Sequence, residues 1–171
     1  AKKIPVMMGS VITEFKFNYP LSDKDAMSEA EREKYVKEHV KQGDADALMA
    51  EWRRVWPGKN VLGVLCGNEL RVNAIKYMEL RNEAGCAPTY TYLFTPHFDW
   101  DGGNLAWHSS ELPFIFHNLD LYPAMVNEDT LKLEAMMSKA WTTFAHTGSP
   151  DHAGLPARWR PHTTDDPATI I

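Results

Sequence analysis

The sequence predicts an α/β protein with a parallel sheet, and three observations carry this prediction. Residues 4–8 form a short apolar run without alternation, which is typical of a strand buried on both faces. Residues 89–95 are rich in β-branched and aromatic side chains and form the second predicted strand. Helix-like segments lie between these strands and after them. Because two strands do not make a stable parallel sheet, we expect the chain to be part of a larger fold.

The first two predicted helices are recognised from their starts and stops. Ser28 and Glu31 form a capping box that begins a helix over residues 28–40, whose many charged side chains indicate a solvated surface. Asp44 can begin a second helix, which ends before Pro57.

Two longer helices are predicted further along the chain. Residues 68–84 carry one apolar stripe and end at Gly85, and residues 128–147 form a long helix that Gly148 stops. The tail that follows is expected to be a surface strap with at most a small edge strand at 168–171. The stripe of the first helix consists of Leu70, Ala74, Tyr77 and Met78, and the buried face of the second of Leu133, Met137, Ala140, Trp141 and Phe144.

Composition narrows the function classes. The 171 residues fit one compact domain, and 44% hydrophobic with 24% charged residues is ordinary for a globular protein. With 18 basic and 23 acidic residues, the formal charge of −5 gives no electrostatic footprint for nucleic acid or an anionic membrane. Cys66 and Cys86 are expected to be free thiols, although one bridge between them is possible.

Several familiar site motifs are absent from the sequence. There is no Gly-x-Ser-x-Gly elbow, phosphate loop or dinucleotide fingerprint, and no histidine or cysteine spacing typical of a metal site. The sequence therefore predicts neither a metal nor a cofactor.

Two polar residues follow the two predicted strands. Glu14 comes just after the first strand, and His108 follows the second by a loop. Sites in open α/β sheets form beyond the carboxyl ends of strands, an imidazole titrates near neutral pH, and a carboxylate can orient it. An acid after one strand and a histidine after the next is the second half of the Ser…Glu…His order of α/β-hydrolases. Taken singly, each residue also fits an ordinary polar loop position.

At these residues the sequence resembles the C-terminal third of type B carboxylesterases, the family of cholinesterases and bacterial para-nitrobenzyl esterases. The strongest match is Ala106–Phe116, which reads AWHSSELPFIF where the family has A-x-H-G-x-E-L-P-F-x-F. The turn at Glu14 resembles the family's G-x-x-x-D-E-G, with Thr13 in place of the aspartate and Phe15 in place of the glycine. Ser109 stands where the family usually has glycine. The motifs occur in the family's order over nearly the whole chain.

The resemblance implies that residues 1–171 are the C-terminal part of a single α/β-hydrolase domain that hydrolyses carboxylic esters. It identifies Glu14 as the triad acid, His108 as the triad base and Glu111 as a supporting residue beside the histidine. Phe114 and Phe116 match aromatic positions close to the substrate pocket. The serine nucleophile and the oxyanion donors belong to the family's N-terminal portion, which these residues do not include.

The partners implied are a small ester substrate and the N-terminal portion of the same fold, and the chain alone is expected to be inactive. An exposed sheet edge predicts self-association. Two other interpretations stay open: a non-catalytic protein-interaction module of the same fold, and an independent small domain. The sequence leaves the cellular location undetermined.

Overall fold

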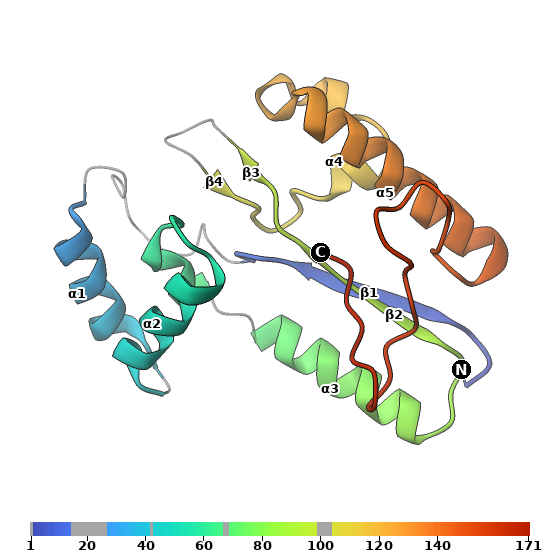
Figure 1. Cartoon of the computed structure of the whole chain (residues 1–171), viewed down its shortest axis with the longest axis horizontal. Helices are drawn as coiled ribbons and strands as arrows, with labels where there is room; N and C mark the ends of the chain where they lie inside the picture. The colour runs from blue at the N-terminus through green and yellow to red at the C-terminus, as the bar shows by residue number, and fades with distance from the viewer. Residues whose placement is uncertain (1, 15–26, 42, 67–68, 99–103) are drawn as a thin grey trace.

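The centre of the chain is a parallel pair of strands, seen in a computed structural model that describes residues 2–14, 27–41, 43–66, 69–98 and 104–171 (Figure 1). Strand β1 (Val6–Val11) pairs with β2 (Thr89–Phe94), and Val6 lies opposite Thr89. Both predicted strands are confirmed, but β1 does not stop at Gly9. It runs on because glycine leaves room for the ring of Tyr92, which a Cβ at this position would overlap.

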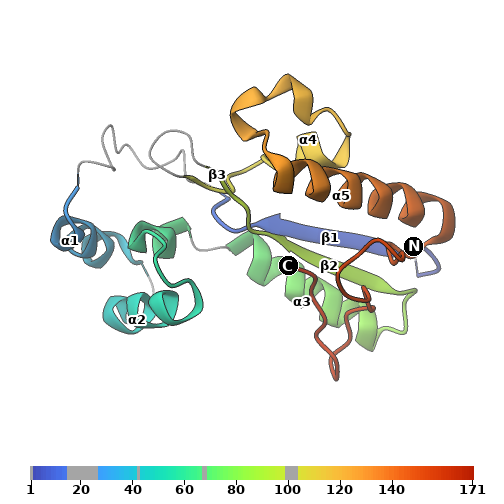
Figure 2. The same cartoon turned by 45° about the horizontal axis from the view of Figure 1, so that its top comes forward.

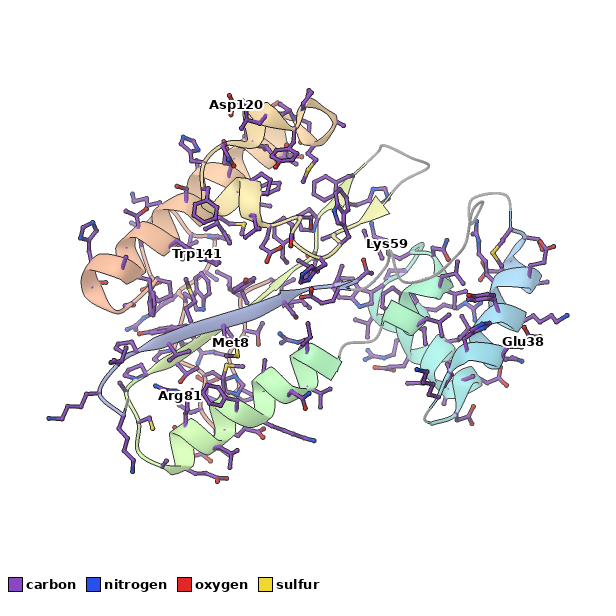
Figure 3. The ribbon with its side chains drawn as sticks, turned by 180° about the vertical axis from the view of Figure 1, so that it is seen from behind. Met8, Glu38, Lys59, Arg81, Asp120 and Trp141 are labelled. Carbon is purple, nitrogen blue, oxygen red and sulfur yellow. The ribbon has the colours of Figure 1, made fainter. Side chains whose placement is uncertain are left out.

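Helices α3 (Glu69–Glu83) and α5 (Glu128–Thr147) lie on opposite sides of this strand pair, as expected for a parallel sheet (Figure 2). Helix α5 has the predicted bounds and ends at Gly148, whose φ of 78° is left-handed. Helix α3 is tied to the strands through the buried Arg81, which donates hydrogen bonds to the carbonyl of Ile4 and the hydroxyl of Thr89. Figure 3 shows Arg81 and Trp141 on the two sides of β1.

The apolar stripe expected on α3 is only partly buried. Met78 is fully buried, whereas Leu70 and Tyr77 are each 45% exposed. Leu80 on the same helix is 63% exposed. The apolar pattern therefore predicted the helix correctly. It overstated how much of the apolar surface of α3 is buried within the described part of the chain.

Helices α1 (Glu29–His39) and α2 (Ala45–Val55) stand beside the sheet with the 3-10 helix η2 (Val61–Cys66) (Figure 1). The predicted capping box is present, because Ser28 and Glu31 each accept a hydrogen bond from the other's backbone N–H. Helix α1 buries only Val36 among its own residues, as expected for a solvated helix. The three helices share a small core made of Val36, Met49, Val61 and Leu62.

Short elements that the sequence did not predict connect β2 to α5. They are β3 (His97–Phe98), β4 (Asn104–Leu105), α4 (Leu112–Ile115), η3 (Leu119–Leu121) and η4 (Pro123–Met125). Elements of two to four residues have no measurable periodicity, so pattern analysis cannot find them. Their side chains join β1, β2 and α5 in the main hydrophobic core.

The tail beyond α5 crosses back over β2 as a strap (Figure 1). Instead of an edge strand, it makes one bridge, in which the N–H of Leu93 donates to Ile170 and the N–H of Ile170 donates to Thr91. Cys86 is a free thiol, as predicted. None of the helices in the described ranges has the length and apolar character needed to cross a bilayer.

Candidate active site

The carboxyl end of β1 places Glu14 in a tight turn. The chain continues from Val11 beside β2, where the N–H of Ile12 donates to the carbonyl of Phe94 over 3.0 Å. Glu14 folds back so that its Oε1 accepts a hydrogen bond of 2.8 Å from the N–H of Val11. The residue is 6% exposed. One oxygen of a buried carboxylate is thereby satisfied by the backbone.

The segment after β2 is joined to the same turn by backbone hydrogen bonds. The N–H and the hydroxyl of Thr13 both donate to the carbonyl of Ala106, over 3.1 and 2.6 Å. Next along the chain, the N–H of His108 donates to the carbonyl of Glu14 over 3.2 Å. These bonds hold the backbones of the acid and the histidine side by side.

The side chains of Glu14 and His108 meet although they are 94 positions apart. Glu14 Oε2 lies 2.7 Å from His108 Nδ1, and the histidine side chain is 56% exposed. A carboxylate only accepts hydrogen bonds, so the contact places a proton on Nδ1. A neutral ring in that tautomer has its lone pair on Nε2, where a general base needs it.

Ser109 forms the corner that turns the chain away from His108 into α4. Its φ is 71°, a left-handed conformation that residues with a Cβ rarely adopt. The N–H of Ser110 donates to the carbonyl of Trp107, and the N–H of Leu112 donates to Ser109. The family glycine at this position thus has a physical reason, and this chain builds the same corner with serine.

Glu111 lies close enough to the pair to interact with it electrostatically. Burial raises the pKa of its carboxyl, the negative charge of Glu14 raises it further, and His108 lowers it. Its Oε2 is buried without a hydrogen-bond partner among the described residues. Burial also raises the pKa of the Tyr92 hydroxyl, and the charges of Glu111 and Glu14 add to this shift. Burial therefore disfavours the ionisation of two groups, Glu111 and Tyr92, that interact electrostatically with Glu14.

The two phenylalanines matched to the substrate pocket have different surroundings. Phe114 is fully buried, with its ring centroid 5.0 Å from that of Phe94 and 6.3 Å from that of Phe98. Phe116 is 70% exposed. Phe114 thus belongs to the core behind the site, and a pocket-lining role for either residue stays a prediction.

Sequence reasoning did not single out Thr13 or Tyr92 as site residues. Thr13 joins the acid turn to the histidine segment, and Tyr92 contributes to the electrostatic surroundings of Glu111. In the sequence, the feature that could have indicated Thr13 is its place next to Glu14. For Tyr92, this feature is its position on the second predicted strand. No set of three or more His, Cys, Asp and Glu residues in the described segments could hold a metal ion.

Two solved structures that match this chain are esterases of the α/β-hydrolase fold, which gives the fold class. An esterase from Clostridium hathewayi, described as hydrolysing aliphatic aromatic polyesters, matches with a TM-score of 0.82 and 35% identity over 98% of this chain. A thermophilic para-nitrobenzyl esterase matches with a TM-score of 0.64 and 24% identity over 97% of this chain, which supports the fold.

The sequence model of the carboxylesterase family matches residues 1–170, so this chain belongs to the carboxylesterase family. Among curated relatives, the para-nitrobenzyl esterase of Bacillus subtilis is 33% identical over 89 residues, which are 50% of this chain. The phenmedipham hydrolase of Pseudarthrobacter oxydans is 30% identical over 118 residues, which are 65% of this chain. The matches cover 18% and 24% of these two relatives and 33% of the Clostridium structure. The resemblance inferred from the sequence is confirmed.

We predict that Ser109→Gly stabilises the fold. Glycine adopts a φ of 71° without the steric cost that serine bears, so the free energy of unfolding should rise by about 1 kcal/mol. Urea denaturation of the two proteins measures the change as a higher midpoint at unchanged slope. An equal or lower midpoint would show that serine makes a compensating interaction at this corner.

We also predict a pH-dependent effect of Glu111→Gln. The pKa of Glu111 is higher in the folded than in the unfolded protein, so ionising it destabilises the fold as pH rises above the ordinary glutamate value. The variant should match the wild type below about pH 4 and become the more stable protein towards neutral pH.

Urea midpoints across this pH range measure the difference between the two proteins. Glu83→Gln, which removes an exposed carboxyl on α3, serves as the matched control. If the stability of wild type and Glu111→Gln changed with pH in the same way, the pKa of Glu111 would not be raised in the folded protein, and the prediction would be wrong.

Proposed function

We propose that this chain is the C-terminal part of a serine carboxylesterase and supplies the acid and the base of its catalytic triad. The hydrogen bond between Glu14 Oε2 and His108 Nδ1 carries the proposal. It joins a buried carboxylate to a half-exposed imidazole, which is the arrangement that orients a general base. Membership of the carboxylesterase family makes carboxylic esters the substrate class.

Each residue has a definite role in the proposed reaction. His108 Nε2 takes the proton of the serine hydroxyl as the oxygen attacks the ester carbonyl, and then returns that proton to the leaving alcohol. The same nitrogen activates the water that releases the acid product. Glu14 keeps the proton on Nδ1 and stabilises the imidazolium. Glu111 has the supporting role beside the histidine that the family resemblance implies, and the exposed ring of Phe116 is available to the substrate pocket.

The serine and the oxyanion donors belong, in this proposal, to the part of the fold that precedes these residues. The matched relatives are about three times as long as the chain. Strand β1 pairs only with β2 within the described part of the chain, so a sheet neighbour can bind its other edge. That edge also supports the expectation of self-association when the chain is alone, which stays a prediction.

Substitutions at the pair test the proposal in the complete gene product. Glu14→Gln keeps the shape of the side chain but can favour the wrong imidazole tautomer, so kcat for p-nitrophenyl acetate should fall by about 10³- to 10⁴-fold. In His108→Gln, kcat for the same ester should fall by at least as much. Glu83→Gln removes a distant exposed carboxyl and should keep wild-type kinetics. Full activity of either site variant would contradict the assignment.

Complementation tests the division of the triad between two parts of the fold. The 171 residues alone should hydrolyse p-nitrophenyl acetate no faster than free imidazole, since no nucleophile elbow occurs in them. Mixing them with the elbow-bearing part should restore turnover, and the His108→Gln chain should fail to restore it. A wild-type mixture without turnover would count against the proposal.

The upstream reading frame gives an independent check, because absence of a Gly-x-Ser-x-Gly elbow there would favour a non-catalytic interaction module.

A further inference from the structure

A second acid–histidine pair lies between α5 and the segment that leads into η3. Glu134 projects from α5 with its side chain 8% exposed, and its Oε2 lies 3.2 Å from His117 Nδ1. Its other oxygen, Oε1, accepts a hydrogen bond of 2.8 Å from the N–H of Leu119. Both oxygens of this buried carboxylate are therefore used to hold one short stretch of chain.

The two pairs share an arrangement, although the imidazole contact is a hydrogen bond of 2.7 Å at Glu14 and a longer approach of 3.2 Å at Glu134. In each, one carboxylate oxygen accepts from a backbone N–H and the other faces the Nδ1 of a mainly exposed imidazole. The side chain of His117 is 65% exposed. It borders an open groove of about 510 Å³ along α5, lined also by Ser138, Lys139 and Thr142.

These pairs lie near the two ends of one segment, residues 106–119. Glu14 holds the segment near its start, and Glu134 holds it at its end. Between them α4 lies beside α5, with Phe114 fully buried (Figure 2). The segment turns at left-handed residues on both sides of α4, Ser109 with a φ of 71° and His117 with a φ of 54°.

We propose that Glu134 and His117 form a positioning pair that fixes the His108 segment against α5, so that the imidazole of His108 stays on Glu14. This inference rests on the proposed function. The last backbone bond before the corner is that of His108 to Glu14, and the histidine ring is more than half exposed. We therefore expect a shift at the far end of this segment to move the ring relative to Glu14. The N–H of Asn118 donates to the carbonyl of Pro113 over 3.1 Å, which couples the held end to α4.

The test compares Glu134→Ala with Glu134→Gln in the complete gene product. Alanine removes both contacts, whereas the glutamine amide oxygen can still accept from Leu119 N–H and its amide group can donate to His117. Hydrogen exchange should accelerate by about tenfold or more over residues 108–119 in Glu134→Ala and stay near wild type in Glu134→Gln. With p-nitrophenyl acetate, kcat should fall by about tenfold in the alanine variant with little change in KM, and glutamine should rescue it.

Thr130→Ala is the matched control on the same helix. Thr130 is buried and exchanges hydrogen bonds with Asn127 at the start of α5, so its loss weakens the helix but removes neither contact of Glu134. We expect lower stability but unchanged exchange over residues 108–116 and unchanged kcat.

Three results would overturn the positioning role. They are faster exchange confined to residues 117–121 in Glu134→Ala, an unchanged kcat in that variant, or an equal loss of kcat in Thr130→Ala. If the wild-type protein hydrolyses no ester, the proposed function fails. Exchange over residues 108–116 then still decides whether Glu134 fixes the segment.

Discussion

A buried carboxylate between a backbone amide and an imidazole is the interaction on which this structure depends. Glu14 is withdrawn from water, and such a group is stable only when its oxygens are hydrogen-bonded. Val11 N–H satisfies one oxygen and His108 Nδ1 the other. The same two bonds that make burial tolerable also fix the tautomer of the histidine. In the proposed mechanism, the hydrogen bonds that stabilise the buried carboxylate are therefore the same ones that prepare the histidine for proton transfer.

The parallel pairing of β1 and β2 makes this contact possible at a separation of 94 positions. Parallel strands end at the same edge of a sheet, so the segments that follow them can meet there. Thr13, just past β1, donates to the carbonyl of Ala106, which follows β4, and a parallel bridge pairs Thr13 with Trp107. Helices α3 and α5 cover the two faces of this pair.

The parts of the molecule that sequence predicted well are those with local signals. Helix α5 has its predicted bounds because an acidic first turn and a terminal glycine mark its ends, and Ser28 with Glu31 marks the start of α1. Glu14 and His108 were found because their order after two strands matches a known motif. The contacts of Glu134 escaped prediction, since nothing local links residue 134 to His117 or Leu119. The extension of β1 through Gly9 was missed for a similar reason, because its cause is a ring on the neighbouring strand.

The central claim is that Glu14 holds a proton on His108 Nδ1, and the imidazole nitrogens can be observed directly. Long-range ¹H–¹⁵N spectra at about pH 8, where an ordinary imidazole is neutral, distinguish the two tautomers of His108. We predict a protonated Nδ1 with a strongly downfield proton, an unprotonated Nε2, and loss of this signature in Glu14→Gln. A ring protonated on Nε2, with a spectrum that Glu14→Gln leaves unchanged, would contradict it.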